Sequence, residues 1–179
     1  MEALEPPEPQ SFEELMLPHM DSAYNIARWL LKDPHQADDA VQEAFLRALK
    51  AFARFRGTDG RAWLLTIVRN TCFSQMRANK RGSREEPFVD ELHGAPDGTA
   101  MENAVAWTEV RSETLNKALE RLPAEFREVI VLHELEGMSY RQIAAITDIP
   151  LGTVMSRLAR ARAKLEAGVA LVAKEETLP

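Results

Sequence analysis

Cysteine is almost absent from this sequence, since Cys72 is the single example among 179 residues. One thiol excludes an internal disulfide framework and any zinc site built from paired thiolates. The four histidines are scattered without the spacing of metal ligands. We therefore predict no metal or other cofactor and no catalytic site. Cys72 lies in an apolar helical stretch and is expected to be inert core rather than a redox sensor.

The sequence also lacks a long apolar run. It begins MEALEPPEPQ, which is acidic and rich in proline, whereas a signal peptide needs a basic start and an apolar segment. No later stretch is long enough to span a bilayer. We expect a cytoplasmic protein whose own chain does not insert into a membrane.

Positive charge is in deficit overall, because the net charge is -6. That average argues against a polyanionic ligand until the charge is mapped along the chain. Residues 51–84 carry +7 and residues 137–166 carry +3, and the acidic residues 85–108 between them carry -6. Two separated basic blocks indicate two surfaces for a polyanion such as DNA.

The strict alternation typical of half-buried strands is missing, and the periodic segments have helical spacing. We predict an all-α fold of two small helical domains: a bundle of three or four helices and a helix-turn-helix bundle, joined by a flexible acidic linker. The predicted parts are an acidic tail at 1–10, a first domain at 11–84, a linker at 85–101, a second domain at 102–172 and a tail at 173–179.

Helix signals support this division. In the first domain, Ser11 and Glu14 form a capping box, and Pro18 is expected to bend the helix that follows. Asp33 is expected to cap a second helix, with Gln36 reaching back, whose apolar stripe is predicted as Val41, Phe45, Ala48 and Phe52. A third helix is predicted from about Asp59 through the basic run near residue 81. In the second domain we predict helices at 102–121 and 124–136, the latter closed by Gly137.

The last part of the chain has the spacing of a helix-turn-helix. Ser139 and Gln142 form a second capping box, DIP makes the turn, and another helix starts between Leu151 and Thr153. The expected packing positions are Ile143, Ala144, Ile146, Ile149, Val154 and Leu158. The second helix should expose hydroxyl and basic side chains that suit a major groove, although such a face can also be merely solvated. The exposed set is predicted as Thr153, Met155, Ser156, Arg157, Arg160, Arg162 and Lys164.

Two stretches resemble a known family. Residues 119–165 resemble region four of extracytoplasmic-function (ECF) sigma factors, including the G-T-V-x-S-R-x-x-R-A-R signature from Gly152 to Arg162. Residues 33–81 resemble region two, with its D-x-x-Q-E-x-F-L-R and W-L-x-x-I-x-x-N helices. The resemblance implies a sigma factor of the sigma-70 family that binds core RNA polymerase, reads promoter DNA and is held inactive by an anti-sigma factor.

The resemblance also implies residue roles. A polar helix face, expected opposite the Val41, Phe45 and Phe52 stripe, would bind core polymerase through Asp38, Asp39, Gln42, Glu43 and Arg47. A loop and helix would open the minus-ten element through Arg56, Thr58, Asp59, Arg61, Arg69, Asn70, Arg77, Lys80 and Arg81. The helix-turn-helix would read the minus-thirty-five element through Ser139, Tyr140, Arg141, Thr153, Met155, Ser156, Arg157 and Arg160. Trp63 is expected in the core.

The sequence departs from the family pattern at two places. The loop before Trp63 lacks the family's serine and aromatic residue, and Met155 stands where a basic residue is frequent. Both changes imply an altered promoter preference. Two other readings remain open at this point: a stand-alone helix-turn-helix regulator, which would not need the basic block 51–84, and a sigma-mimicking adaptor, which would not need the DNA-facing arginines.

Overall fold

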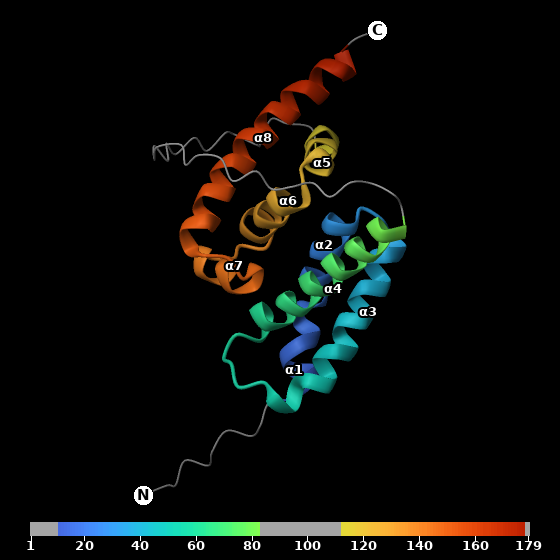
Figure 1. The fold of residues 1–179 in the computed structure, drawn as a ribbon, viewed down its shortest axis with the longest axis vertical. Helices are drawn as coiled ribbons and strands as arrows, with labels where there is room; N and C mark the ends of the chain where they lie inside the picture. Colours follow the sequence, from blue (N-terminus) through green and yellow to red (C-terminus); the bar gives the residue numbers. More distant parts are fainter. Residues whose placement is uncertain (1–10, 83–111, 178–179) are drawn as a thin grey trace, which may run out of the picture.

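The computed structural model of this chain describes residues 11–82 and 112–177, and every regular element in these two ranges is helical (Figure 1). The predicted all-α class with two small helical domains is confirmed. The predicted N-terminal tail, the linker at 85–101 and the beginning of the helix predicted at 102–121 lie outside the described residues.

The first helical unit, residues 11–82, contains α1 (Phe12–Met16), α2 (Met20–Leu31), α3 (Pro34–Ala51) and α4 (Gly60–Gly82). The capping box of Ser11 and Glu14 is present, and Pro18 lies in a 3-10 turn that separates α1 from α2, as predicted. Asp33 caps α3 by accepting a hydrogen bond from the Gln36 backbone N–H at 2.9 Å. The Gln36 side chain does not complete a box, because its amide oxygen accepts a hydrogen bond from Asn79 on α4.

The buried face of α3 shares only Ala48 with the predicted stripe. Its fully buried side chains are four alanines, Ala37, Ala40, Ala44 and Ala48. Their spacing of three and four residues places them on one face, where small side chains let α3 approach α2 and α4 closely. Val41, Phe45 and Phe52 are only partly buried. The prediction placed the bulkier residues in the core because they are more hydrophobic. The close approach of the helices instead leaves room only for the smaller side chains at the centre of this face.

The second helical unit, residues 112–177, contains α5 (Ser112–Arg121), α6 (Ala124–Ile130), α7 (Tyr140–Thr147) and α8 (Leu151–Thr177). The helix predicted at 124–136 is α6 followed by a π-helical turn (Val131–Leu135), and Gly137 ends it with φ +64°. That left-handed conformation favours glycine. α8 continues through residues 173–177, which were expected to be a tail. In this part of the helix Glu175 pairs with Arg121 of α5 at 2.7 Å.

α7 and α8 form the predicted helix-turn-helix. Ser139 caps α7 through a complete box with Gln142, and Asp148 adopts a left-handed conformation in the turn. The side chains expected between the two helices are buried, with Ile143, Ile146, Val154 and Leu158 each at most 1% exposed. Ala144 is partly buried and Ala145 is exposed, so only Ala144 assists close packing of the two helices.

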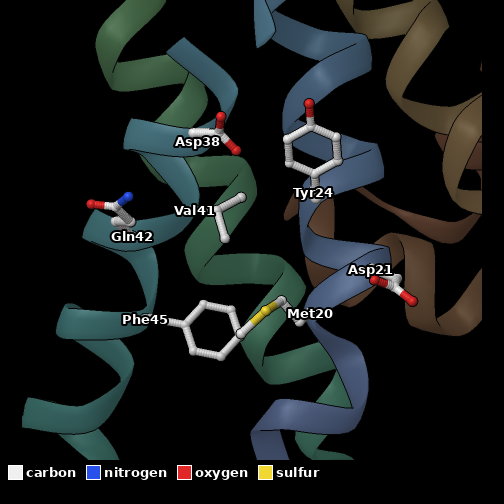
Figure 2. A pocket seen from close by; sticks show the side chains of 7 residues that line it. All are labelled: Met20, Asp21, Tyr24, Asp38, Val41, Gln42 and Phe45. Carbon is white, nitrogen blue, oxygen red and sulfur yellow. The ribbon is translucent and has the colours of Figure 1, made fainter. Parts of the chain in front are cut away.

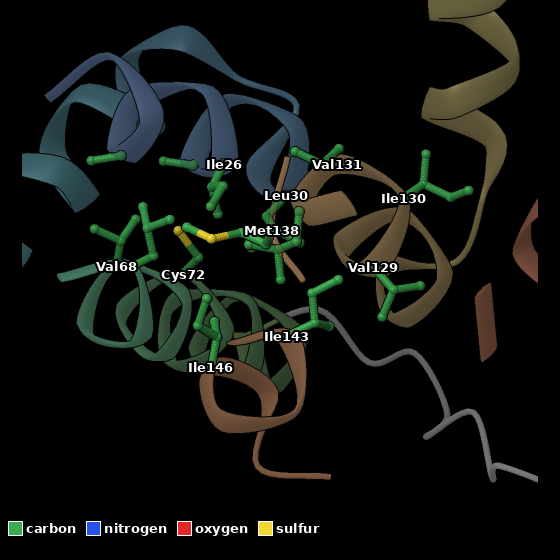
Figure 3. Packing of buried hydrophobic residues seen from close by; sticks show 14 of the residues in the cluster. Ile26, Leu30, Val68, Cys72, Val129, Ile130, Val131, Met138, Ile143 and Ile146 are labelled. Carbon is green, nitrogen blue, oxygen red and sulfur yellow. The ribbon is translucent and has the colours of Figure 1, made fainter. Parts of the chain in front are cut away.

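The two helical units pack against each other through a shared apolar core. α7 lies on α4, and α6 lies on α2. Figure 3 shows Ile26, Leu30, Val68 and Cys72 from the first unit facing Met138 and Ile143 from the second. All of these side chains belong to one buried cluster. The structure is therefore closed, with the seam between the units running along α4 and α7.

Candidate nucleic-acid and polymerase interfaces

The polar face predicted on α3 borders an apolar pocket. Asp38 and Gln42 line a pocket of about 450 Å³ together with five residues of α2 and α3: Met20, Asp21, Tyr24, Val41 and Phe45. Figure 2 shows Val41 and Phe45 beside Asp38 and Gln42, between the two helices. The expectation that the polar face lies opposite the Val41, Phe45 and Phe52 stripe is wrong for Asp38 and Gln42, because these two residues line the α2–α3 groove together with Val41 and Phe45. Glu43 and Arg47 form an exposed ion pair on α3.

α3 also exposes two leucines that sequence reasoning missed. Leu46 is 58% exposed and Leu49 is 53% exposed. Both lie one or two turns from Gln42, so they extend the same outward surface. The sequence signal that could have identified them is that both leucines lie outside the helix face formed by the four alanines. We call Asp38, Asp39, Gln42, Leu46 and Leu49 the α3 outer face.

The loop before α4 holds several residues predicted at the minus-ten element. Arg56 and Thr58 are exposed, and the Arg56 guanidinium donates to the backbone oxygen of Ala53 at 2.7 Å. Asp59 caps α4 by accepting from the Ala62 N–H at 2.9 Å, and it also accepts from the side-chain amide of Gln142 on α7 at 2.7 Å. These two hydrogen bonds lower the pKa of Asp59. Its carboxylate is therefore engaged across the seam.

The aromatic residues around this loop form a small cluster. Phe55 lies 4.8 Å from Trp63 between ring centroids, and it stacks on Phe52 at 6.2 Å. Trp63 is partly buried against the core, in agreement with its predicted role. Its contact with Phe55 fixes the loop to α4.

Arg61 binds a carboxylate of the second unit. Its guanidinium donates to Glu136 at 2.6 Å and to the Ser22 hydroxyl at 3.0 Å. Asn25 donates to the other oxygen of Glu136 at 3.2 Å. Glu136 is 8% exposed, and its role was not predicted because its partners lie 75 and 111 positions away in the chain.

Arg69 and Arg157 converge on one buried carboxylate, Glu128 of α6. The Arg69 guanidinium donates to both Glu128 oxygens, at 2.9 and 3.3 Å. An Arg157 nitrogen lies 3.6 Å from the same carboxylate, and the Glu128 side chain is 1% exposed. Burial raises the pKa of the Glu128 carboxyl, and the two guanidinium groups oppose that shift. The prediction that Arg157 is exposed is wrong, since its side chain is only 15% exposed.

The other predicted minus-ten residues remain open to solvent. Asn70, Arg77, Lys80 and Arg81 are exposed along α4. The Asn70 amide oxygen accepts a hydrogen bond from Arg69 at 3.3 Å. α4 therefore presents a basic surface toward its C-terminal end.

Part of the outer face of the helix-turn-helix is accessible, whereas Thr153 and Ser156, which were also predicted to be exposed, are partly buried. Arg141, Met155 and Arg160 are exposed, with Met155 at 51%. The Arg160 guanidinium lies 5.6 Å from the Phe126 ring, which supports the side chain without covering it. The remaining predicted residues contribute local structure: Ser139 caps α7, Tyr140 packs on His133 at 5.0 Å, and Ser156 donates to the Thr153 backbone at 3.1 Å. Arg162, expected to be exposed, is partly buried and pairs with Glu134 at 2.6 Å.

Within the described ranges, no group of three or more histidine, cysteine, aspartate or glutamate side chains is placed to hold a metal ion. None of the helices described is both long enough and apolar enough to cross a membrane. Cys72 is buried, and burial raises the pKa of its thiol to about 12.

Comparisons with known proteins match both helical units. A sigma-70 region 2 model matches residues 15–82, and a sigma-70 region 4 model matches residues 112–165. The chain is 30% identical over 165 residues to the RNA polymerase sigma-H factor of Pseudomonas aeruginosa, covering 88% of this chain and 85% of that protein. It is 37% identical over 136 residues to the ECF RNA polymerase sigma-E factor of Escherichia coli, covering 72% and 71%.

A solved structure has a fold similar to that of this chain. The sigma factor RpoE, in complex with the anti-sigma factor NepR from Bartonella quintana, matches with a TM-score of 0.70 and 30% identity, covering 89% of this chain and 96% of that chain. The two helical units thus define a transcription factor of the sigma-70 type. The chain belongs to the ECF sigma factors of the sigma-70 family.

Proposed function

We propose that this chain is an alternative sigma factor that binds core RNA polymerase and directs promoter-specific transcription initiation in the cytoplasm. The observation that carries the proposal is the presence of two separate basic surfaces, on α4 and on the helix-turn-helix, in a chain that belongs to the ECF family. Linking two modest recognition modules raises specificity through effective concentration.

The polymerase-binding role falls on the α3 outer face together with Glu43 and Arg47. Asp38, Asp39 and Gln42 provide acceptors there, and the neighbouring pocket offers an apolar cavity beside them. An interface with a central apolar anchor and a polar rim is the usual composition of specific protein contacts. This face lies away from the seam, so the closed chain can still present it.

The minus-ten role falls on the loop before α4 and on the exposed cations of that helix. Arg77, Lys80 and Arg81 suit the DNA backbone, and Asn70 and the loop residues Arg56 and Thr58 suit an unstacked base. Asp59, Arg61 and Arg69 belong to the same predicted set, but in the closed chain they bind groups of the second unit.

The minus-thirty-five role falls on the helix-turn-helix. Arg141, Met155 and Arg160 are available for contacts in the major groove, whereas Arg157 must leave Glu128 before it reaches DNA. Ser139, Tyr140, Thr153 and Ser156 complete the predicted surface. Because Asp59, Arg61 and Arg69 are held across the seam, the proposal includes a separation of the two units before both promoter elements are read.

An anti-sigma factor is the proposed regulatory partner. The support is the similarity to a sigma factor whose solved structure is a complex with an anti-sigma factor. The α3 outer face and the groove beside it are the open surface that such a partner and the polymerase would share.

Run-off transcription with the cognate core polymerase on genomic fragments tests the function. Initiation at defined start sites that depends on the added chain is the expected result. Footprinting of DNA by the chain alone, without promoter-specific initiation on any fragment, would instead identify a stand-alone regulator. Binding to polymerase without any effect of the DNA-facing arginines would identify a sigma-mimicking adaptor.

Paired variants separate the two roles. Arg160→Ala should weaken minus-thirty-five recognition in the polymerase complex by about 1–3 kcal/mol and leave polymerase affinity unchanged. The double variant Asp39→Ala and Glu43→Ala should lower polymerase affinity and leave DNA binding by the chain alone unchanged. Equal effects of both variants in both assays would contradict these assignments.

A further inference from the structure

Glu128 occupies an unusual position between the two promoter-facing surfaces. It is 2% exposed, and it lies where α4, α6 and α8 meet. Its two arginine partners come from the two predicted DNA sites, Arg69 from the minus-ten set and Arg157 from the minus-thirty-five set. One carboxylate therefore ties together the residues that the proposed function sends to two different DNA elements.

Other contacts close the same seam around Glu128. Arg61 binds Glu136 at 2.6 Å, and Asp59 accepts from Gln142 at 2.7 Å. Arg127 of α6 donates to the backbone oxygen of Leu30, at the end of α2, at 3.3 Å. Beneath these polar groups the apolar cluster continues from one unit into the other (Figure 3).

Glu128 and its two arginine partners form a buried ionic cluster. Desolvation offsets much of its attraction, but the loss of one partner leaves the other charges buried and uncompensated. Without the Glu128 charge, two guanidinium groups would face each other inside the seam. The closed arrangement therefore depends on the Arg69–Glu128 pair, which joins the two units, whereas the Arg157–Glu128 contact lies within the second unit.

We propose that Glu128 is an intramolecular latch whose ion pair with Arg69 holds the two units closed and withholds Arg69 from DNA, while Arg157 of α8 contacts the same carboxylate from within the second unit. Opening exchanges the carboxylate for DNA phosphates, since a guanidinium binds either anion with similar bidentate geometry. The inference rests on the proposed function, because it takes these arginines as promoter contacts. The apparent DNA affinity of the free chain is then reduced by the fraction of molecules that are open.

The test compares Glu128→Gln with Glu134→Gln in the full chain. Both variants remove one negative charge and keep the side-chain shape, but Glu134 is largely accessible and its ion-pair partner, Arg162, lies inside the second unit. The measurements are the affinity for a labelled random-sequence DNA duplex, by fluorescence anisotropy, and the radius of gyration, by small-angle X-ray scattering.

Glu128→Gln should raise the apparent DNA affinity by about tenfold or more and enlarge the radius of gyration. Without the latch a larger fraction of the molecules is open, and the apparent affinity rises with that fraction. Glu134→Gln should change the affinity only by the small effect of one net charge and leave the size unchanged. Equal gains in affinity for both variants, or an unchanged radius for Glu128→Gln, would overturn the latch.

A second variant covers the case in which Glu128→Gln loses its helical circular dichroism. Glu136→Gln releases Arg61 at the rim of the same seam, and it should produce the same direction of change in size and affinity. A compact Glu136→Gln chain with unaltered DNA affinity would count against the proposal.

The outcome for the latch is separable from the outcome for the function. Promoter-specific transcription by the native chain, combined with an unaltered Glu128→Gln variant, would refute the latch alone. Opening and tighter DNA binding by Glu128→Gln, in a chain that supports no transcription, would keep the latch and refute the sigma role.

Discussion

Leu46 offers a direct test of how the polymerase-binding face works. Its side chain is 58% exposed on α3, and full burial of a leucine side chain is worth about 1.5–3 kcal/mol. If core polymerase covers the exposed part, Leu46→Ala should cost about 1–1.5 kcal/mol of binding, which raises Kd roughly 5- to 10-fold. Stability should hardly change, because alanine is the better helix former and little of Leu46 is packed in the free chain.

The assay is competition for labelled core polymerase, with thermal unfolding measured alongside. Leu171→Ala is the matched control, since Leu171 is 53% exposed on α8 and lies in the second unit. The reasoning fails if both variants weaken polymerase binding equally, or if Leu46→Ala leaves Kd unchanged.

Three further predictions follow from other parts of the structure. Ala44 is fully buried between α3 and its neighbours, so Ala44→Leu should destabilise the chain by about 1–3 kcal/mol by overpacking, measured as a lower urea midpoint, while Lys50→Leu on the exposed side should not. Met155 is 51% exposed on α8, where its apolar side chain suits a thymine methyl group in the major groove. Replacing thymine by deoxyuridine in the minus-thirty-five element should therefore weaken run-off transcription by the native chain and have less effect with Met155→Ala. Burial raises the pKa of Cys72 from 9.0 to about 12, so the native thiol should resist iodoacetamide at neutral pH until the chain is unfolded. Because the folded state holds this proton more tightly than the unfolded state, the free energy of unfolding should fall as pH rises above about 9, and urea titrations across that range check the sign.

Local signals gave the helix boundaries correctly wherever a cap was present. Ser11, Asp33 and Ser139 each bind a backbone N–H three positions later, so every partner in these contacts lies within one helical turn of sequence. The same short range fixes the helix-turn-helix, in which a capping box and the turn at Asp148 stand next to each other in the chain. Such contacts need no knowledge of the rest of the fold.

The packing of α3 shows where the sequence was insufficient. Helical periodicity shows that one face of α3 is apolar. Because Val41 and Phe45 are strongly hydrophobic, the sequence placed them at the centre of the buried face, whereas they lie at its edge. The alanines are the buried residues because α3 lies close to α2 and α4. The distance between these helices is a property of the assembled bundle. The displaced Val41 and Phe45 instead line the pocket beside the polar face.

The sequence by itself determined the all-α class, the capped helices and the basic helix-turn-helix, because each depends on residues within a few positions of one another. Only the tertiary structure decided that Arg69 and Arg157 share the Glu128 carboxylate, since these partners lie 59 and 29 positions from it along the chain. An arginine on a helix can serve a DNA phosphate or a buried glutamate with the same guanidinium. Which anion it binds depends on the helix that packs against it, and for Arg69 and Arg157 that helix is α6, which carries Glu128.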